Sequence, residues 1–233
     1  MKTGKYLNYY GRRRGKKLSK VQNDYMTNYL PKVTPKNISW HENPDRKKLK
    51  IEEIFGETCA VWLEIGFGGG EHLLSIARKN RNIGIIGCEP YRNGVAMMLP
   101  RLAKENLSKV KVYMDDARIL FEVLPNFSIA KIFLLFPDPW PKLRHKQRRF
   151  INKENLEAFK RILSVNALIH IATDVNEYAR HVLETFNNDE SFEWVAESAN
   201  DWRNPWKDWE QTRYSNKASL YGRNTIFMIF KRL

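Results

Sequence analysis

One run limits what this chain can fold into more than any other: residues 60–75, which read AVWLEIGFGGGEHLLS. A short apolar segment with a single acid, Val61 to Ile65, leads into glycines at positions 66, 68, 69 and 70. After the glycines, apolar side chains recur at helical spacing. A buried strand that breaks at a glycine turn and continues into a helix opens a βαβ unit, and glycine lets a ligand approach the backbone closely. The run therefore predicts an α/β fold whose first turn holds a nucleotide-like cofactor.

The spacing of the glycines and acids bears on which cofactor this is. The dinucleotide fingerprint GxGxxG needs a third glycine three residues after the second, where this chain has Glu71. Instead, Glu64 stands two residues before Gly66, and a carboxylate there suits the ammonium and sulfonium of S-adenosylmethionine. A second acid, Glu89, follows the next apolar run, at a position where a carboxylate can accept both ribose hydroxyls. We expect S-adenosylmethionine; the alternatives are an NAD-dependent oxidoreductase and a glycine turn that only packs a helix on a sheet.

Strand and helix patterns alternate after this run. The predicted strands are 61–65, 83–88, 110–114, 129–136, 166–172, 192–196 and 224–230, with helices at 69–79, 92–106 and 175–186. The alternation predicts a doubly wound, Rossmann-like, mostly parallel sheet of seven strands that binds ligands at the carboxyl ends of its strands. We expect a basic arm and linker at residues 1–58 and a cofactor-binding domain at residues 59–233, with the folded core beginning near residue 59.

Each of the first five predicted strands is followed or ended by an acid. These acids are Glu64, Glu89, Asp116, Asp138 and Asp174. An isolated acid in such a place is more often a helix N-cap, and for Asp174 that alternative is nearly even with a functional role. Because the topology gathers the strand ends at one edge, we expect the five to surround a cationic ligand or a base with several donors.

The positive charge of the chain is confined to two segments. The formal net charge is +14, and residues 1–20 carry eight lysines and arginines with no acid. Residues 139–153 carry six more, again with no acid, so the two segments account for the whole excess. Charge gathered in this way indicates a polyanion partner, and nucleic acid is the leading candidate. We expect phosphate contacts from Arg12 to Arg14, Arg148 and Arg149, although a solvated tail or loop is the alternative for either segment alone.

The cysteines, the histidines and the lengths of the apolar runs indicate neither a metal site nor a membrane span. Cys59 and Cys88 have no CxxC spacing and the histidines show no ligand spacing, so no metal site is expected. No apolar run reaches membrane-spanning length, and the basic N-terminus is not followed by an apolar stretch. We therefore expect no membrane partner and a cytoplasmic location, for a monomer or a homodimer.

The most distinctive motif is FPDPWPKLRHKQRR, at residues 136–149. Pro137 and Pro139 restrict the backbone on both sides of Asp138, so its carboxylate is expected to point in a fixed direction just outside the sheet. An acid held in this way beside a basic loop suits a site that modifies a nucleic-acid base. Together, EIGFGxG, FPDPWxKxRH, ATD and TxY resemble the bacterial tRNA (guanine-N7-)-methyltransferase family. The segment YGRRRGKKLSK also resembles the N-terminal arm of that family, so the resemblance covers nearly the whole chain.

The resemblance implies a class I S-adenosylmethionine-dependent enzyme that methylates N7 of a guanine in the tRNA variable loop (position 46). Residues 1–58 would then be a basic RNA-binding arm and linker, and residues 59–233 the methyltransferase domain. Asp138 is its implied catalytic residue. The implied donor-binding residues are Glu64, Gly66, Gly68, Glu89, Asp116, Ala117 and Asp138. The implied tRNA-contacting residues are Lys142, Asp174, Thr212, Arg213, Tyr214 and Ser215. Ser215 departs from the family pattern, which has glutamate there.

Three questions stay open at the level of sequence. An enzyme that methylates an exocyclic base nitrogen is the nearest alternative, because such enzymes carry somewhat similar Asp-Pro-Trp loops. A non-catalytic RNA-binding protein would account for the basic segments, but it would not need the row of acids. The tryptophans between Glu193 and Glu210 are expected to pack as an irregular lid, with a base-stacking platform as the alternative.

Overall fold

The computed structural model of the chain describes residues 8–233, so residues 1–7 of the predicted basic arm lie outside the described residues. The strands are β1 (Val61–Ile65), β2 (Gly84–Cys88), β3 (Val110–Tyr113), β4 (Ile129–Leu135), β5 (Leu163–Thr173), β6 (Phe192–Trp194) and β7 (Ile226–Arg232). The helices before β4 are α1 (Lys20–Asn28), α2 (Leu30–Val33), α3 (Ile51–Phe55), α4 (Glu71–Lys79), α5 (Arg92–Glu105) and α6 (Ala117–Val123). The later ones are η1, a 3-10 helix (Leu143–Arg148), then α7 (Lys153–Ile162), α8 (Asn176–Asn187), α9 (Asn200–Arg203) and α10 (Arg213–Leu220).

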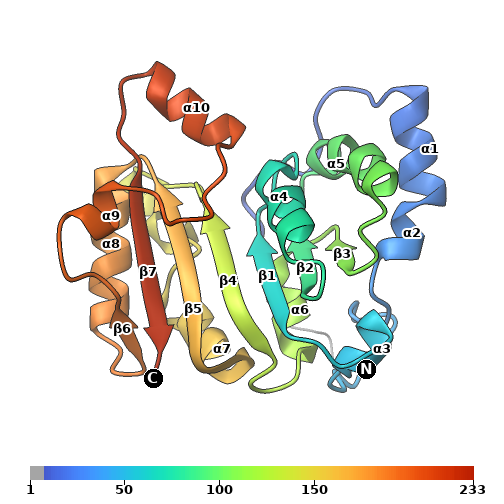
Figure 1. Cartoon of the computed structure of the whole chain (residues 1–233), viewed down its shortest axis with the longest axis horizontal. Helices are drawn as coiled ribbons and strands as arrows, with labels where there is room; N and C mark the ends of the chain where they lie inside the picture. The colour runs from blue at the N-terminus through green and yellow to red at the C-terminus, as the bar shows by residue number, and fades with distance from the viewer. Residues whose placement is uncertain (1–7) are drawn as a thin grey trace.

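The seven strands form one sheet in the order β3-β2-β1-β4-β5-β7-β6 (Figure 1). Neighbouring strands from β3 to β5 run parallel, and β7 runs antiparallel to both β5 and β6. The carboxyl ends of β1 to β5 therefore meet at one edge of the sheet. The predicted doubly wound, mostly parallel sheet is confirmed.

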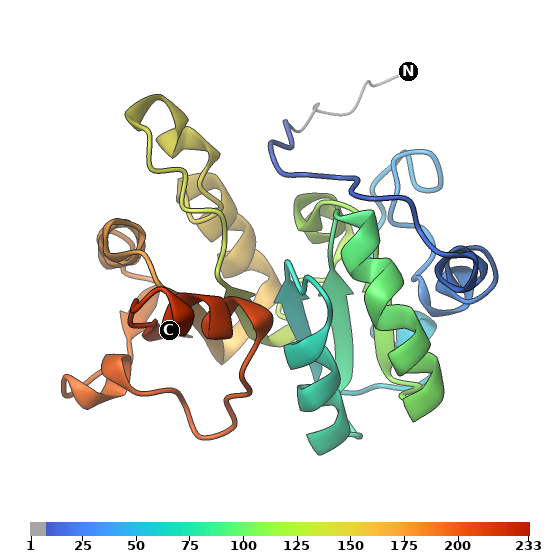
Figure 2. The ribbon, with the colours of Figure 1, turned by 90° about the horizontal axis from the view of Figure 1, so that it is seen from above.

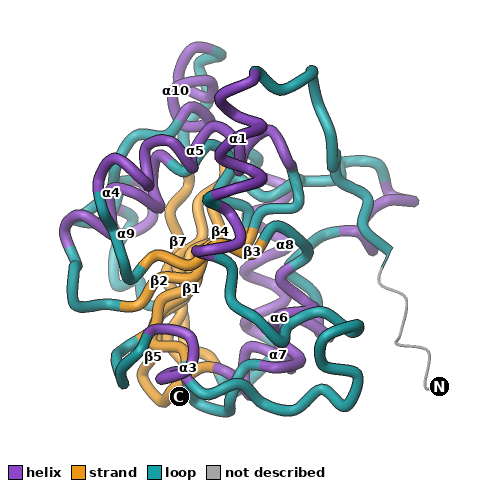
Figure 3. Tube along the Cα trace, turned by 90° about the vertical axis from the view of Figure 1, so that its right-hand side faces the viewer, coloured by secondary structure: helices purple, strands orange, loops and turns teal. Residues whose placement is uncertain are grey.

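Helices cover both faces of the sheet, which explains why its central strands are apolar almost throughout. Figures 2 and 3 show α4 and α5 on one face and α6, α7 and α8 on the other. Leu63 of β1 pairs with Ile86 of β2 and Ile132 of β4, and all three are fully buried. This packing fixes the strand register, because a shift by one residue would turn each side chain to the opposite face.

The folded core begins earlier in the chain than residue 59, where we expected it. Ile38, Leu49 and Ile54 lie in the same hydrophobic cluster as Val61 of β1. The backbone of Leu49 also donates a hydrogen bond to the carbonyl of Val123 at the end of α6. The prolines of this segment indicated a linker, but its spaced apolar side chains cover one end of the sheet. A separate RNA-binding role for residues 1–58 stays a prediction.

The tryptophan-rich segment packs as an irregular cover, as expected, and not as a free platform. Trp206 and Trp209 both meet the ring of Phe227 on β7 edge to face, with centroids 5.5 and 5.0 Å apart. Trp206 also lies 4.8 Å from the ring of His170 on β5. These rings take the place of a helix on this part of the sheet. Within the described chain, no helix combines the length and apolar character needed to cross a bilayer.

The role of residues before β1 in the core can be tested with Ile38→Ala. Ile38 is 0% exposed, so the change should remove about 2–4 kcal/mol from the free energy of unfolding through lost burial and a cavity. Urea denaturation measures this loss. The control Val21→Ala changes an exposed side chain on α1 and should stay within about 0.5 kcal/mol of the parent. Equal small effects would show that residue 38 lies outside the cooperative core.

Candidate active site

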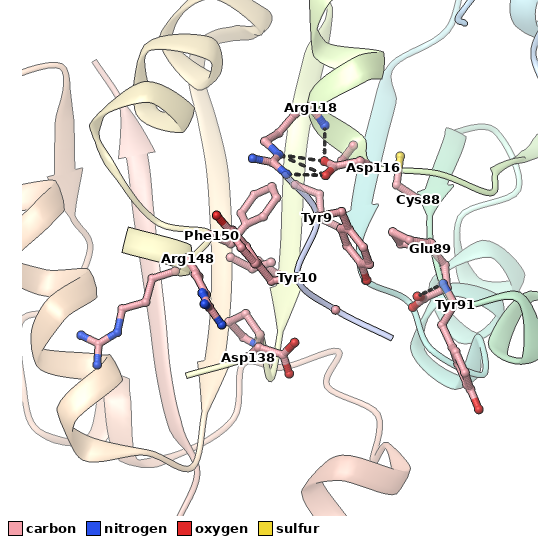
Figure 4. A pocket seen from close by; sticks show the side chains of 18 of the residues that line it. Tyr9, Tyr10, Cys88, Glu89, Tyr91, Asp116, Arg118, Asp138, Arg148 and Phe150 are labelled. Atoms are coloured by element: carbon pink, nitrogen blue, oxygen red, sulfur yellow. Dashed lines mark hydrogen bonds and ion pairs between the residues drawn. The ribbon is translucent and has the colours of Figure 1, made fainter. Parts of the chain in front are cut away.

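A cavity of about 490 Å³ opens at the carboxyl ends of β1 to β4 (Figure 4). The lining comes from the turns that follow these strands, from residues 147–155, from Tyr214 of α10, and from residues 8–12 of the N-terminal arm. Seven of the residues implied by the family resemblance line it: Gly66, Gly68, Glu89, Asp116, Ala117, Asp138 and Tyr214. The topology therefore brings together residues that lie far apart in the sequence.

The glycine turn after β1 adopts a backbone that requires glycine. Gly66 and Gly68 have φ angles of 76° and 56°, which other residues rarely adopt. The turn is also closely covered by α5, because a Cβ added to Gly94 would lie 2.3 Å from the carbonyl oxygen of Gly68. Because the glycines have no side chains, the turn presents its main-chain atoms to the cavity, where a ligand can approach them.

Glu89, at the end of β2, holds the glycine turn in place. Its Oε2 accepts a hydrogen bond of 2.6 Å from the N–H of Gly68, and its Oε1 accepts one of 2.8 Å from the N–H of Tyr91. Burial raises the pKa of Glu89, while the two N–H donors lower it in part. Because a carboxylate offers about four acceptor directions, Glu89 retains capacity to accept hydrogen bonds from a ligand.

Asp116, at the end of β3, has two structural partners inside the cavity. Its Oδ1 caps α6 by accepting from the N–H of Arg118 at 3.0 Å, as the helix-cap alternative suggested. Its Oδ2 also forms a 2.5 Å ion pair with the Arg118 guanidinium (Figure 4). Arg118 was not predicted as a site residue, although its position two residues after a capping acid was a signal for this pair. Its Nη2 also donates to the carbonyl of Asn8 in the arm.

Asp138 projects from a constrained turn after β4. Phe136 and Trp140 have positive φ angles of 50° and 42°, a conformation that costs on the order of 1–3 kcal/mol for each non-glycine residue. Within residues 8–233, the Asp138 carboxylate forms no hydrogen bond or ion pair. Burial raises its pKa above the ordinary value of 3.8. The carboxylate is therefore available to a ligand in the cavity.

Glu64 lies near the cavity but does not line it. Its side chain is 2% exposed, and its Oε2 is 2.9 Å from Nδ1 of His72 on α4. His72 is buried as well and packs against Phe133 of β4. No sequence pattern indicated this histidine partner, because a single histidine on a helix is usually only packed. The geometry makes Glu64 a buried neighbour of the glycine turn.

Most of the residues implied to contact tRNA lie outside the cavity. Asp174 forms an ion pair of 2.8 Å with Arg223, and Arg213 pairs with Glu71 at the start of α4. Lys142 is exposed and precedes η1. Among these residues only Tyr214 faces the cavity, with its ring stacked on Phe136 at a centroid distance of 6.3 Å.

Thr212 and Ser215 form the capping box of α10. The Thr212 hydroxyl accepts from the N–H of Ser215 at 3.1 Å, and the Ser215 hydroxyl accepts from the N–H of Thr212 at 2.8 Å. Capping boxes pair serine or threonine with glutamate or glutamine, so Ser215 performs the capping role that glutamate would have at this position. The residue that departs from the family pattern therefore keeps the helix start that presents Tyr214.

Residues 8–12 of the N-terminal arm line one side of the cavity. Arg13 forms a 3.0 Å ion pair with Asp115, and its carbonyl accepts from the N–H of Arg92 at the start of α5. The side chain of Tyr9 points into the cavity (Figure 4). Burial and the carboxylates of Glu89 and Asp138 raise its pKa. The sequence showed the charges of the arm but not that an aromatic side chain from it enters the cavity.

The basic segment after Asp138 divides into an exposed part and a buried part. The guanidinium of Arg148 lies over the rings of Tyr10 and Trp140, 4.4 and 5.0 Å from their centroids. Arg149 is only 2% exposed and is bonded to Pro139 and Glu177, so the prediction that it contacts phosphate is wrong. Because these two arginines are adjacent, the sequence alone does not indicate which of them is buried. Over residues 8–233, no group of three or more His, Cys, Asp or Glu side chains is arranged to hold a metal ion.

Sequence comparison places the chain among known proteins. A profile of a family described as putative methyltransferase matches residues 59–228. A protein from Jannaschia sp. (strain CCS1) named tRNA (guanine-N(7)-)-methyltransferase is 48% identical over 227 residues, which cover 97% of this chain and 95% of that protein. The chain belongs to the tRNA (guanine-N7-)-methyltransferase family. A relative of the same name from Agrobacterium fabrum is 39% identical over 224 residues, covering 96% of this chain and 94% of the relative.

Solved structures of other methyltransferases share the fold of this family member. A 16S rRNA methyltransferase, KamB, aligns with a TM-score of 0.56 at 12% identity, covering 80% of this chain and 95% of that one. An rRNA methylase from Streptococcus thermophilus aligns with a TM-score of 0.51 at 12% identity, covering 75% and 87%. The solved structures therefore confirm the fold as well as the topology does. The relatives named tRNA (guanine-N(7)-)-methyltransferase show that the chain is a methyltransferase enzyme.

The role of Ser215 as a cap can be tested with Ser215→Ala. Loss of the reciprocal hydrogen bond should destabilise α10 by about 1 kcal/mol. Hydrogen exchange of the α10 amides should become faster, while the amides of α7, whose cap is Asn152, should keep their rates. Unchanged exchange in α10 would show that the hydroxyl does not stabilise the helix start.

Proposed function

We propose that this enzyme transfers a methyl group from S-adenosylmethionine to N7 of a guanine in the variable loop of tRNA (position 46), in the cytoplasm. The observation that carries the proposal is one cavity that joins the glycine turn and Glu89 to an unpaired Asp138, with cationic segments on both sides. The tRNA (guanine-N7-)-methyltransferase relatives support the choice of substrate atom.

The residues at the ends of β1 to β3 fit the methyl donor. The glycine turn leaves exposed backbone, and Glu89 retains acceptor capacity for ribose hydroxyls. We assign donor contacts to Gly66, Gly68, Glu89, Asp116 and Ala117, and to Asp138 at the methyl end. When bound, S-adenosylmethionine supplies an electrophilic methyl group on a sulfonium. Glu64 is proposed to act from behind the turn, where its Oε2 lies 2.9 Å from Nδ1 of His72.

Asp138 is proposed as the catalytic residue. N7 of guanine carries a lone pair and no proton, so no general base is needed and placement of the base is the main requirement. Placement of this kind can contribute about 7–11 kcal/mol. The Asp138 carboxylate would accept hydrogen bonds from N1–H and the amino group of guanine. It would also stabilise the positive charge that spreads into the ring as N7 gains a bond.

The substrate is held by groups around the mouth of the cavity. Lys142, Arg148 and the cations of the arm (residues 1–58) are proposed to contact phosphates, and Tyr214 is proposed to contact the base. Asp174, Thr212, Arg213 and Ser215 are proposed to act by fixing the segments around this mouth, through the partners described above. A base that is stacked within folded tRNA would have to turn outward to enter.

Mapping the methylated atom tests the proposal directly. Purified enzyme, tRNA transcript and labelled donor should yield label at a guanine N7, which makes the RNA chain cleavable after reduction. Label that resists such cleavage would move the reaction to an exocyclic nitrogen. A chain that transfers no label to any tRNA would overturn the proposal.

Asp138→Ala should lower the single-turnover rate by roughly 100-fold, because the base loses its orienting acceptor. Donor affinity, measured by calorimetry, should remain within a few fold, since the other donor contacts are kept. Asp138→Asn separates the contribution of charge from that of shape. Lost donor binding together with a normal single-turnover rate would contradict the role of Asp138.

The pH profile gives a second measure of the same residue. Because burial raises the pKa of Asp138, the active carboxylate should be lost as pH falls through a value above 3.8. The single-turnover rate of the wild type should fall with it. In Asp138→Asn this acid limb should disappear, and its persistence would assign the limb to another group.

Deletion of residues 2–17 should raise the apparent KM for tRNA more than it lowers turnover. The arm supplies a large share of the positive charge, so phosphate contacts and their salt dependence should weaken together. Initial rates over a range of tRNA and salt concentrations provide the measurement. An unchanged KM at physiological salt would show that the arm does not bind RNA.

A further inference from the structure

Arg149 is the largest of the fully buried side chains in residues 8–233, and it carries a charge. Removing a guanidinium from water is unfavourable unless its donors are bonded. Even well-bonded buried ion pairs often add little net stability compared with apolar residues of similar volume. Global stability is therefore a poor explanation for this arginine, and its particular partners indicate another role.

The partners of Arg149 belong to two different parts of the chain. Its Nε donates a hydrogen bond of 2.9 Å to the carbonyl of Pro139, the residue directly after Asp138. Its Nη2 donates at 3.0 Å to Oε1 of Glu177, in the first turn of α8. One planar group thus links the Asp138 turn to a helix packed on the sheet. A lysine has a single ammonium and cannot reproduce this fixed two-sided geometry.

The turn that carries Asp138 depends on such outside contacts. Its residues Phe136 and Trp140 both have positive φ, and Pro137 and Pro139 have no N–H to donate. On the β4 side, the N–H of Phe136 donates to the carbonyl of Ala172 at 2.7 Å. On the other side, the Arg149 bond to Pro139 provides the corresponding anchor. Asp138 lies between these two anchors.

We propose that Arg149 is a positioning residue that holds the Asp138 carboxylate in its catalytic direction through the Pro139 carbonyl. The inference rests on the proposed function, in which Asp138 orients the guanine. It assigns to one arginine of the basic segment a task inside the protein, whereas its neighbour Arg148 lies over the rings of Tyr10 and Trp140. Loss of Arg149 should impair the chemical step more than the binding of either substrate.

The test compares Arg149→Lys and Arg149→Met with wild type under single-turnover conditions at saturating donor and tRNA. We expect the rate to fall by about 10- to 100-fold in both, because a small displacement of a catalytic group has an effect of that order. Calorimetry should give a donor Kd within about threefold of wild type. Rates within twofold of wild type in both variants would overturn the inference.

Arg161→Met is the matched control. Arg161, at the end of α7, also donates to backbone carbonyls, those of Leu124 and Phe121, but these lie before β4 at the opposite edge of the sheet. The change should lower the melting temperature without changing the single-turnover rate. If Arg161→Met slowed the reaction as much as Arg149→Met, the effect would be general destabilisation and the inference would fail.

Chemical rescue supplies a readout that a purely structural role would not move. Arg149→Ala leaves space for methylguanidinium, which should raise the rate at least threefold, while Arg161→Ala should show no gain. An absence of rescue in a folded Arg149→Ala protein would count against the inference. The wild-type enzyme in the same assay distinguishes failure of the proposed function from failure of the Arg149 inference. If the wild type transfers no methyl group to tRNA, the proposed function is wrong. If only the variants behave unlike the expectation, the Arg149 inference is wrong.

Discussion

The hydrogen bond between the N–H of Gly68 and the carboxylate of Glu89 is the contact on which the site depends. It joins the turn after β1 to the end of β2 at a point where α5 also approaches the Gly68 carbonyl. The N–H of Gly66 also donates to the carbonyl of Cys88 at 2.8 Å, so two bonds tie the turn to the end of β2. With the bond in place, exposed backbone and acceptor oxygens face the same cavity. This is the side of the cavity where we propose that the methyl donor binds.

The opposite side of the cavity is built on different principles. There the direction of Asp138 comes from prolines, two left-handed residues and bonds to the flanking segments. No helix dipole or strand pairing holds the carboxylate directly. The glycine-turn side therefore uses the regular features of a parallel sheet, whereas the Asp138 turn uses an irregular backbone held by side chains. The sheet is shared with other methyltransferases, and the Asp138 turn is where we propose that the chemistry of this family takes place.

Sequence patterns predicted the sheet well because its strands are apolar on both faces and are separated by amphipathic helices. Which side chains pair with one another was harder to predict. Glu64 pairs with His72, eight residues along the chain, and Arg149 pairs with Glu177 on another helix. Neither pairing has a periodic signal, since it depends on how elements pack in space. The burial of Ile38 in the core was not predicted either, because the prolines around it indicated a linker.

The antiparallel course of β7 has a practical consequence for engineering. This strand carries the chain away from the cavity, and the backbone of Leu233 donates to the carbonyl of Ser191 at the far edge of the sheet (Figure 1). An affinity tag or fluorescent protein fused after Leu233 would emerge on the side remote from the reaction. At the other end of the described chain, Asn8 lines the cavity. Carboxyl-terminal fusions are therefore the suitable choice for immobilising this enzyme with its entrance unobstructed.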